Sequence, residues 1–197
     1  MIPVENYEYI DLGLPSGTLW ATCNVGANSP EEIGDYFAWG ETKTKNEFDW
    51  NNYKFGINPI TKYNEQDNLS TLQIEDDAAT VNWGIDWCTP SPDQWEELIR
   101  YTTGWDERHG QGVLLTASNG QSMFLPFTSI RTCEYLTCSL YPYTYSTHNI
   151  GYQSFLHYGE YAWHYIIWFD HHWKLYDWGA EEYSRCKGRC VRPIRSK

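Results

Sequence analysis

The chain has 197 residues, 41% of them hydrophobic and 17% aromatic, which is enough for one domain with a substantial core. The formal net charge is −12, and it is uneven: residues 1–130 hold 6 Lys and Arg against 20 Asp and Glu, whereas residues 131–197 hold 8 against 6. Nucleic acids and anionic membranes need clustered positive charge, so this composition argues against both as partners. No run of 18 apolar residues occurs, which predicts no direct insertion into a membrane.

The first predicted element is a hairpin over residues 7–25. Residues 9–12 lead into the turn Pro15-Ser16-Gly17, and residues 18–22 return as a second strand. Residues 26–70 are rich in Asn, Gly, Asp and Thr and predict a long irregular segment. We expect aromatic side chains to anchor that segment: Tyr36, Phe37, Trp39, Phe48, Trp50 and Tyr53.

Two helices are predicted next. Residues 75–83 form a short one, with acidic residues at the end where the helix dipole favours them, and Gly84 ends it. In the second, Ser91 is the N-cap, Pro92 takes the first helical position and Gln94 completes a capping box. Its apolar face consists of Trp95, Leu98 and Ile99.

Strands are predicted in the rest of the chain. Residues 113–116 and 122–125 flank an Asn119-Gly120 turn and predict a hairpin. Residues 166–169 and 173–176 predict another, which turns at residues 170–172. Residues 190–192 predict a last strand that Pro193 ends near a sheet edge. Together these elements predict an α+β fold of antiparallel sheets, two helices and long ordered loops.

Aromatic residues are concentrated at the C-terminal end. Residues 131–197 contain ten Tyr, four Trp, two Phe and five of the six His, without a helical or strand period. Tyr, Trp and His combine an apolar face with a polar group and lose little rotamer entropy on contact. This pattern is typical of a binding surface.

Motifs of catalysis are missing from the sequence. It contains no G-x-S-x-G, H-E-x-x-H, Walker or dinucleotide-binding pattern, and His109 is the one His outside the aromatic tail. The paired acids Glu96-Glu97 are explained by a solvated helix face. His171 and His172 are adjacent and would point apart, so they are poor joint ligands. We expect no catalytic residue, no metal and no cofactor.

The six cysteines and the basic end are assigned structural roles. The pairs Cys133-x4-Cys138 and Cys186-x3-Cys190 lack the usual zinc spacing, so reduced thiols are the default, with a disulfide or a zinc site as alternatives. We expect the arginines of residues 185–192 to pair with the acidic body and hold the terminal strand.

Long motifs make the chain recognisable. Residues 9–27 (YIDLGLPSGTLWATCNVGA) resemble the opening motif of the "major paralogous domain" proteins of gut bacteria, and residues 34–41, 76–84, 92–98 and 191–193 match further motifs. That family is similar to the formylglycine-generating-enzyme branch of the C-type lectin fold, which includes the variable proteins of diversity-generating retroelements. In those proteins template adenines are randomised, so that Asn codons change into codons for Tyr, His, Ser, Cys and others.

The resemblance implies a single C-type-lectin-like domain over residues 1–197. Residues 1–130 would be the scaffold, residues 131–190 the variable region, and residues 191–197 the terminal strand and tail. The four tail tryptophans, Glu181 and Glu182 cannot be reached from an Asn codon by adenine change, which assigns them to the scaffold. Cys133, Cys138, Cys186 and Cys190 would be unpaired products of variation.

Residues that would contact a ligand follow from the same resemblance. They are Tyr141, Tyr143, Tyr145, His148, Asn149, His157, Tyr158, Tyr161, His164, Ile167, His171, His172, Tyr176 and Tyr183. The implied function is binding of a protein or carbohydrate on another cell or host surface, by a protein located on the cell surface, with a leader removed, or on a phage virion. The alternatives are an invariant adhesin or carbohydrate-binding domain of the same fold and, less favoured, an oxidase of the formylglycine-generating type.

Overall fold

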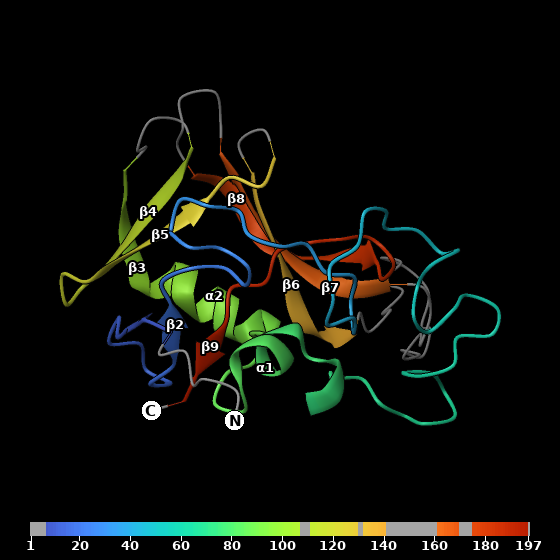
Figure 1. Cartoon of the computed structure of the whole chain (residues 1–197). Helices are drawn as coiled ribbons and strands as arrows, with labels where there is room; N and C mark the ends of the chain where they lie inside the picture. The colour runs from blue at the N-terminus through green and yellow to red at the C-terminus, as the bar shows by residue number, and fades with distance from the viewer. Residues whose placement is uncertain (1–6, 107–110, 130–131, 141–160, 170–174, 197) are drawn as a thin grey trace, which may run out of the picture.

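The computed structural model describes residues 7–106, 111–129, 132–140, 161–169 and 175–196, with backbone alone at 103–106, 161–169 and 175–183. Within these ranges the fold is mixed α/β, with two α-helices and small antiparallel sheets (Figure 1), which is compatible with the expected α+β class. The elements are β1 (Tyr9–Ile10), β2 (Leu19–Ala21), the 3-10 helix η1 (Ile74–Asp76), α1 (Ala78–Trp83), α2 (Pro92–Tyr101), β3 (Thr102–Asp106), β4 (Gly112–Ala117), β5 (Ser122–Pro126), β6 (Thr132–Leu140), β7 (Tyr161–Phe169), β8 (Leu175–Ser184) and β9 (Ile194–Arg195).

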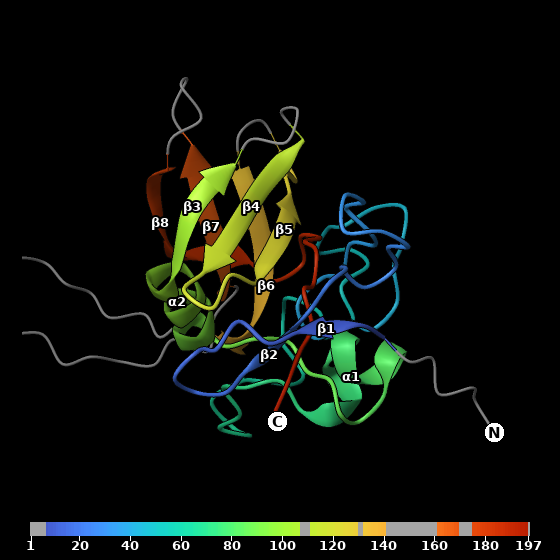
Figure 2. The same ribbon diagram turned by 90° about the vertical axis from the view of Figure 1, so that its left-hand side faces the viewer.

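Three sheets of three strands each organise the described residues. Their strand orders are β1-β2-β9, β3-β4-β5 and β6-β7-β8. Figure 2 shows the second and third sheets as successive layers, with α2 at their lower end. Helix α2 packs against all three strands of the β6-β7-β8 sheet and against β3.

The N-terminal hairpin is confirmed, with shorter strands than expected. Tyr9 pairs with Ala21, and the turn closes with a 2.9 Å hydrogen bond from the Gly17 amide to the Leu14 carbonyl. Gly17 has a φ of 74°, a conformation that favours glycine. The hairpin therefore supplies two strands of a three-stranded sheet, and β9 supplies the third strand.

The predicted last strand is wrong in position. The strand is β9, after Pro193, whereas Cys190 forms only an isolated parallel bridge with Tyr135. The Pro193 carbonyl accepts a 2.9 Å hydrogen bond from the Ala21 amide. Proline has no N–H but keeps its acceptor, so it joins the sheet through its carbonyl. Because proline cannot donate to a strand ladder, β9 begins after Pro193, and the preceding Arg192 is buried.

The irregular segment is held by its rings, as expected. No helix or strand forms between β2 and η1 in this described stretch. Phe37, Trp39 and Tyr53 are buried, Phe48 and Trp50 pack beside them, and Tyr36 packs on the neighbouring core.

Helix α2 follows its sequence signals closely. The Gln94 amide donates to Ser91 Oγ at 3.2 Å, and the Ser91 amide donates to Gln94 Oε1 at 2.8 Å, so both halves of the capping box form. Trp95, Leu98 and Ile99 are buried, as predicted.

The first predicted helix is divided at Asp77. The Asp77 carboxylate accepts from the amides of Ala79 and Thr80 and is the N-cap of α1. Asp76 is buried instead of facing solvent at a helix end, because Lys54 Nζ and Tyr63 Oη donate to its carboxylate at 2.6 and 2.7 Å. Gly84 ends α1 as expected.

Strand β6 was not predicted, and its position explains why. Tyr135 is buried in a first core with Trp20, Trp95 and residues of β4 and β5, whereas the next residue, Leu136, is buried in a second core. The second core also contains Phe37, Trp39, Tyr63 and Val191. Because both faces of β6 are covered, its sequence lacks the alternation of a half-exposed strand.

Candidate ligand-binding surface

The β6-β7-β8 sheet positions the part of the tail that the structure describes. Strand β7 is central: Ile167 pairs with Cys133 of β6, and His164 pairs with Leu136 of β6 and Glu181 of β8. Strand β8 is an edge strand, since no described strand pairs with its other side. An edge strand leaves a row of backbone donors and acceptors for a partner.

Five of the predicted contact residues lie in these strands. Tyr161, His164 and Ile167 belong to β7, and Tyr176 and Tyr183 belong to β8. The others lie outside the described residues: Tyr141, Tyr143, Tyr145, His148, Asn149, His157, Tyr158, His171 and His172.

The described candidates do not gather at one point. Tyr183 pairs with Ala162 near the start of β7, whereas Tyr176 follows Leu175, which pairs with Phe169 at its end. At about 3.3 Å per residue these ends are roughly 23 Å apart. The five described candidates are therefore spread along the length of the two strands.

Residues 185–191 hold this sheet to the rest of the chain. The Leu136 amide donates to the Cys190 carbonyl at 2.9 Å, and Phe37 and Arg189 exchange backbone hydrogen bonds of 2.9 and 3.0 Å. Arg189 Nε lies 2.7 Å from Glu134 Oε2. The C-terminal segment thus joins β6 to the irregular segment.

The arginines of residues 185–192 were predicted to pair with the acidic residues 1–130, and the described contacts differ from this prediction. Arg189 pairs with Glu134, which lies outside residues 1–130. Arg195, which was not in the predicted set, has its Nη2 3.8 Å from Asp86 Oδ2. Arg185 is buried, and its Nη2 donates to the Tyr63 carbonyl at 2.9 Å. The guanidinium carbon of Arg185 is 5.4 Å from the Trp39 ring centroid.

Arg192 also binds carbonyls rather than a carboxylate. Nη1 donates to the carbonyls of Ala21, at 3.1 Å, and of Thr22, and Nη2 donates to the Phe124 carbonyl at 3.0 Å. A guanidinium has five donors in a rigid plane, so it can satisfy several fixed acceptors at once. The expected role in holding the terminal strand is correct, but carbonyl groups of β2 and β5 supply the contacts.

All six cysteines are free thiols. Cys133, Cys186 and Cys190 are buried, which places them in the core instead of on an exposed face. Burial raises the pKa of Cys190 to about 12 and that of Cys133 further. The pKa of Cys138 is also raised by burial. These thiols therefore ionise less readily than an exposed cysteine does.

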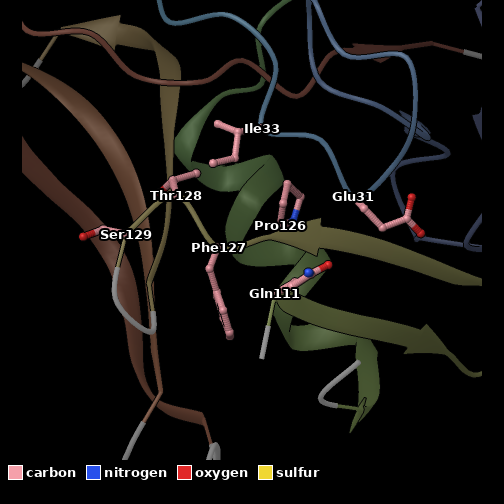
Figure 3. A pocket seen from close by; sticks show the side chains of 7 residues that line it. All are labelled: Glu31, Ile33, Gln111, Pro126, Phe127, Thr128 and Ser129. Carbon is pink, nitrogen blue, oxygen red and sulfur yellow. The ribbon is translucent and has the colours of Figure 1, made fainter. Parts of the chain in front are cut away.

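An open hollow of about 590 Å³ lies beside the end of β5 (Figure 3). Three separate segments line it, and the residues are Glu31, Ile33, Gln111, Pro126, Phe127, Thr128 and Ser129. The sequence offered no signal for this group, because each residue is unremarkable in its own segment. Tertiary contacts alone bring them together.

Over the described ranges, no group of three or more His, Cys, Asp or Glu side chains is arranged to hold a metal ion. In those ranges no helix is both long and apolar enough to cross a bilayer.

No model of a known protein family, no curated protein and no solved structure matches the chain.

Proposed function

We propose that this chain is a ligand-binding protein of C-type-lectin-like fold whose C-terminal region is diversified by a retroelement. Recognition would come from replaceable Tyr and His side chains on a fixed framework. The ligand would be a protein or a carbohydrate on another cell or host surface.

One observation supports this proposal above others: the motifs that carry the resemblance contact one another in the fold. Residues 9–27 and 191–193 meet through hydrogen bonds from the Val25 amide to the Val191 carbonyl, at 3.0 Å, and from the Ala21 amide to the Pro193 carbonyl, at 2.9 Å. Residues 34–41 meet the chain just after β8, where the Trp39 amide donates to the Arg185 carbonyl at 2.9 Å. The motifs at both ends of the chain therefore contact each other, and the Tyr- and His-rich residues lie between them in the sequence.

Burial narrows the region in which replacement would be tolerated. Cys133, Tyr135 and Leu136 of β6 are buried, as are Cys186 and Cys190. Changing the volume of a packed core residue destabilises a fold. Replaceable positions are therefore proposed within residues 141–183 instead of across the whole of 131–190.

The strand positions of the candidate contact residues also indicate which of them a partner can approach more readily. His164 and Ile167 occupy the central strand, opposite the buried residues Leu136 and Cys133. Tyr176 and Tyr183 occupy the edge strand β8. A partner can approach an edge strand more readily than a central one, so the two tyrosines are the stronger candidates.

Aromatic side chains account for how such a surface would gain affinity. Tyr supplies a large contact area at low entropic cost, and Tyr and His add adaptable hydrogen bonds. A standard interface buries roughly 800 Å² per partner, an area that residues 141–183 could supply. Display in several copies would raise the avidity of weak single sites.

Sequencing the genomic neighbourhood of the gene tests the proposal. We expect a reverse transcriptase, a template repeat matching the 3′ end of the gene, and sibling copies that differ where the template has adenine. The absence of both the template repeat and the reverse transcriptase would refute diversification and favour an invariant adhesin or carbohydrate-binding domain.

Metal analysis of the purified protein tests the enzymatic alternative. We expect less than stoichiometric copper and zinc in protein prepared without chelator. A stoichiometric copper, together with turnover of a cysteine-containing peptide, would instead support an oxidase.

A further inference from the structure

We propose that Asn119 is a site of spontaneous deamidation, and that its conversion to aspartate or isoaspartate releases the β4–β5 turn from the N-terminal segment. The sequence contains a single Asn-Gly step, at residues 119–120. This site lies within residues 1–130, outside the region proposed to vary, so it depends neither on diversification nor on a ligand.

The reaction needs water and no other reactant. The backbone nitrogen of Gly120 gives its proton to solvent and bonds to Cγ of Asn119, which closes a succinimide ring. The bond from Cγ to Nδ2 breaks, and Nδ2 takes up a proton and leaves as ammonia. Water then opens the ring. Breaking the bond between Cγ and the Gly120 nitrogen gives aspartate, whereas breaking the bond to the Asn119 backbone carbon gives isoaspartate, and neither route transfers electrons.

Exposure and the following residue make Asn119 accessible to this reaction. Residues 118–121 are exposed, so water and base reach the turn. Gly120 has no side chain to crowd its nitrogen, and glycine moves its backbone more freely than other residues do. Asn28 is also exposed but is followed by Ser29, so it is a comparison of lower reactivity within the same chain.

The Asn119 side chain joins two segments that are distant in the sequence. Its Nδ2 donates to the Asp11 carbonyl at 2.9 Å, and its Oδ1 accepts from the Gln121 amide at 3.0 Å. A Cβ placed on Gly13 would lie 3.2 Å from Asn119 Nδ2, so the two segments are closely packed here. The amide therefore holds the β4–β5 turn against the N-terminal segment (Figure 2).

Deamidation removes the donor from this contact. A carboxylate only accepts hydrogen bonds, so the Asp11 carbonyl would lose its partner and a negative charge would be added beside an acidic residue. Isoaspartate also adds one carbon atom to the main chain between residues 119 and 120. That insertion would disturb the closure of the turn, where the Ala117 amide donates to the Gln121 carbonyl at 2.9 Å.

The folded turn opposes its own modification. The Gly120 amide donates to the Ala117 carbonyl at 3.0 Å, which retains the proton that the reaction must remove and holds the nitrogen in the turn. The leaving group, Nδ2 of Asn119, is held by the Asp11 carbonyl. The reaction should therefore be slower in the folded chain than in the chain unfolded by urea at the same pH and temperature.

Peptide mapping by mass spectrometry tests the inference on the full chain. The protein is incubated at mildly alkaline pH, folded or in urea, and Asn119 and Asn28 are compared in the same samples. We expect faster loss of Asn119 than of Asn28 in both conditions, with aspartate and isoaspartate as products, and faster loss of Asn119 in urea than in the folded chain. Gly120→Ala should slow the loss in urea, where the conformation of the folded turn no longer matters.

A product-like variant tests the effect on the fold. Asn119→Asp should raise the equilibrium constant for unfolding in urea about fivefold, the factor that corresponds to one net hydrogen bond. The matched control is Gln121→Glu, which adds the same charge to the same exposed turn and leaves the hydrogen bond from Asn119 to Asp11 in place. It should change that constant by about twofold or less.

Four results would overturn the inference. They are loss of Asn119 no faster than that of Asn28, equal rates for Gly120→Ala and the parent chain in urea, equal rates for the folded and unfolded parent chain, and equal stability of Asn119→Asp and Gln121→Glu. None of these results bears on the genomic test of diversification, so the two proposals fail separately.

Discussion

Replacing Arg192 by methionine should break the connection between the C-terminal segment and two sheets. The side chain is buried, and its guanidinium donates to the carbonyls of Ala21 and Thr22 on the β2 side and of Phe124 in β5. Methionine has a comparable length and no donor. Three carbonyls would therefore lose a hydrogen bond while the apolar packing is largely kept.

The expected magnitude follows from those three bonds. A buried acceptor that loses its donor costs about 1–3 kcal/mol, which gives roughly 3–9 kcal/mol for three. Methionine also removes the cost of burying a guanidinium, which offsets several kcal/mol. We therefore expect a loss of about 3–4 kcal/mol in the free energy of unfolding. Domains commonly have about 5–15 kcal/mol, so the variant should remain folded.

Urea denaturation followed by tryptophan fluorescence measures this loss. The control is Arg100→Met, because Arg100 is exposed on α2 and forms an i,i+4 pair with Glu96. That change should cost less than about 0.5 kcal/mol. Arg192→Lys should be intermediate, since one ammonium cannot reach three carbonyls in a plane. A loss for Arg192→Met below about 1 kcal/mol, or equal to that of the control, would refute the reasoning.

Further predictions concern local features of the fold. Burial alone would raise the pKa of Asp76, but hydrogen bonds from Lys54, Lys62 and Tyr63 hold that pKa below its ordinary value of 3.8. The stability that Asp76 adds should therefore be fully present above pH 3.8 and lost as pH falls through the lower folded pKa, so Asp76→Asn and the parent chain should converge in unfolding free energy in acid. Ser91→Ala should lower the free energy of unfolding in urea by about 1 kcal/mol through loss of the N-cap; no change would contradict the capping role. Gly112→Ala should lower the thermal midpoint and cost about 1–3 kcal/mol, because its Cβ would lie 2.3 Å from the Leu125 carbonyl oxygen. Titration with a thiol reagent should count all six cysteines after unfolding but fewer in the native protein; fewer than six after unfolding would indicate a disulfide.

Local signals predicted local structure well. The capping box and the apolar face of α2, the Asn119-Gly120 turn and the proline-led turn at residues 15–17 depend on neighbours a few positions apart, so they can be recognised without the fold. Strand β6 could not be recognised, because its residues alternate between two cores built from distant segments. The predicted helix over residues 75–83 was divided for a similar reason, since Lys54 and Tyr63 hold the Asp76 carboxylate in the interior.

The candidate sites also combine features that composition indicates with features that only tertiary contacts create. Composition alone placed the aromatic, His-rich residues in the C-terminal third and separated them from an acidic first part. The three-dimensional structure decided that Cys133, Cys186 and Cys190 are core residues and that Arg185 and Arg192 bind carbonyls. It also assembled the hollow from segments near residues 31, 111 and 127. Burial and partner choice depend on contacts between residues tens of positions apart, and no short-range pattern in the chain encodes those contacts.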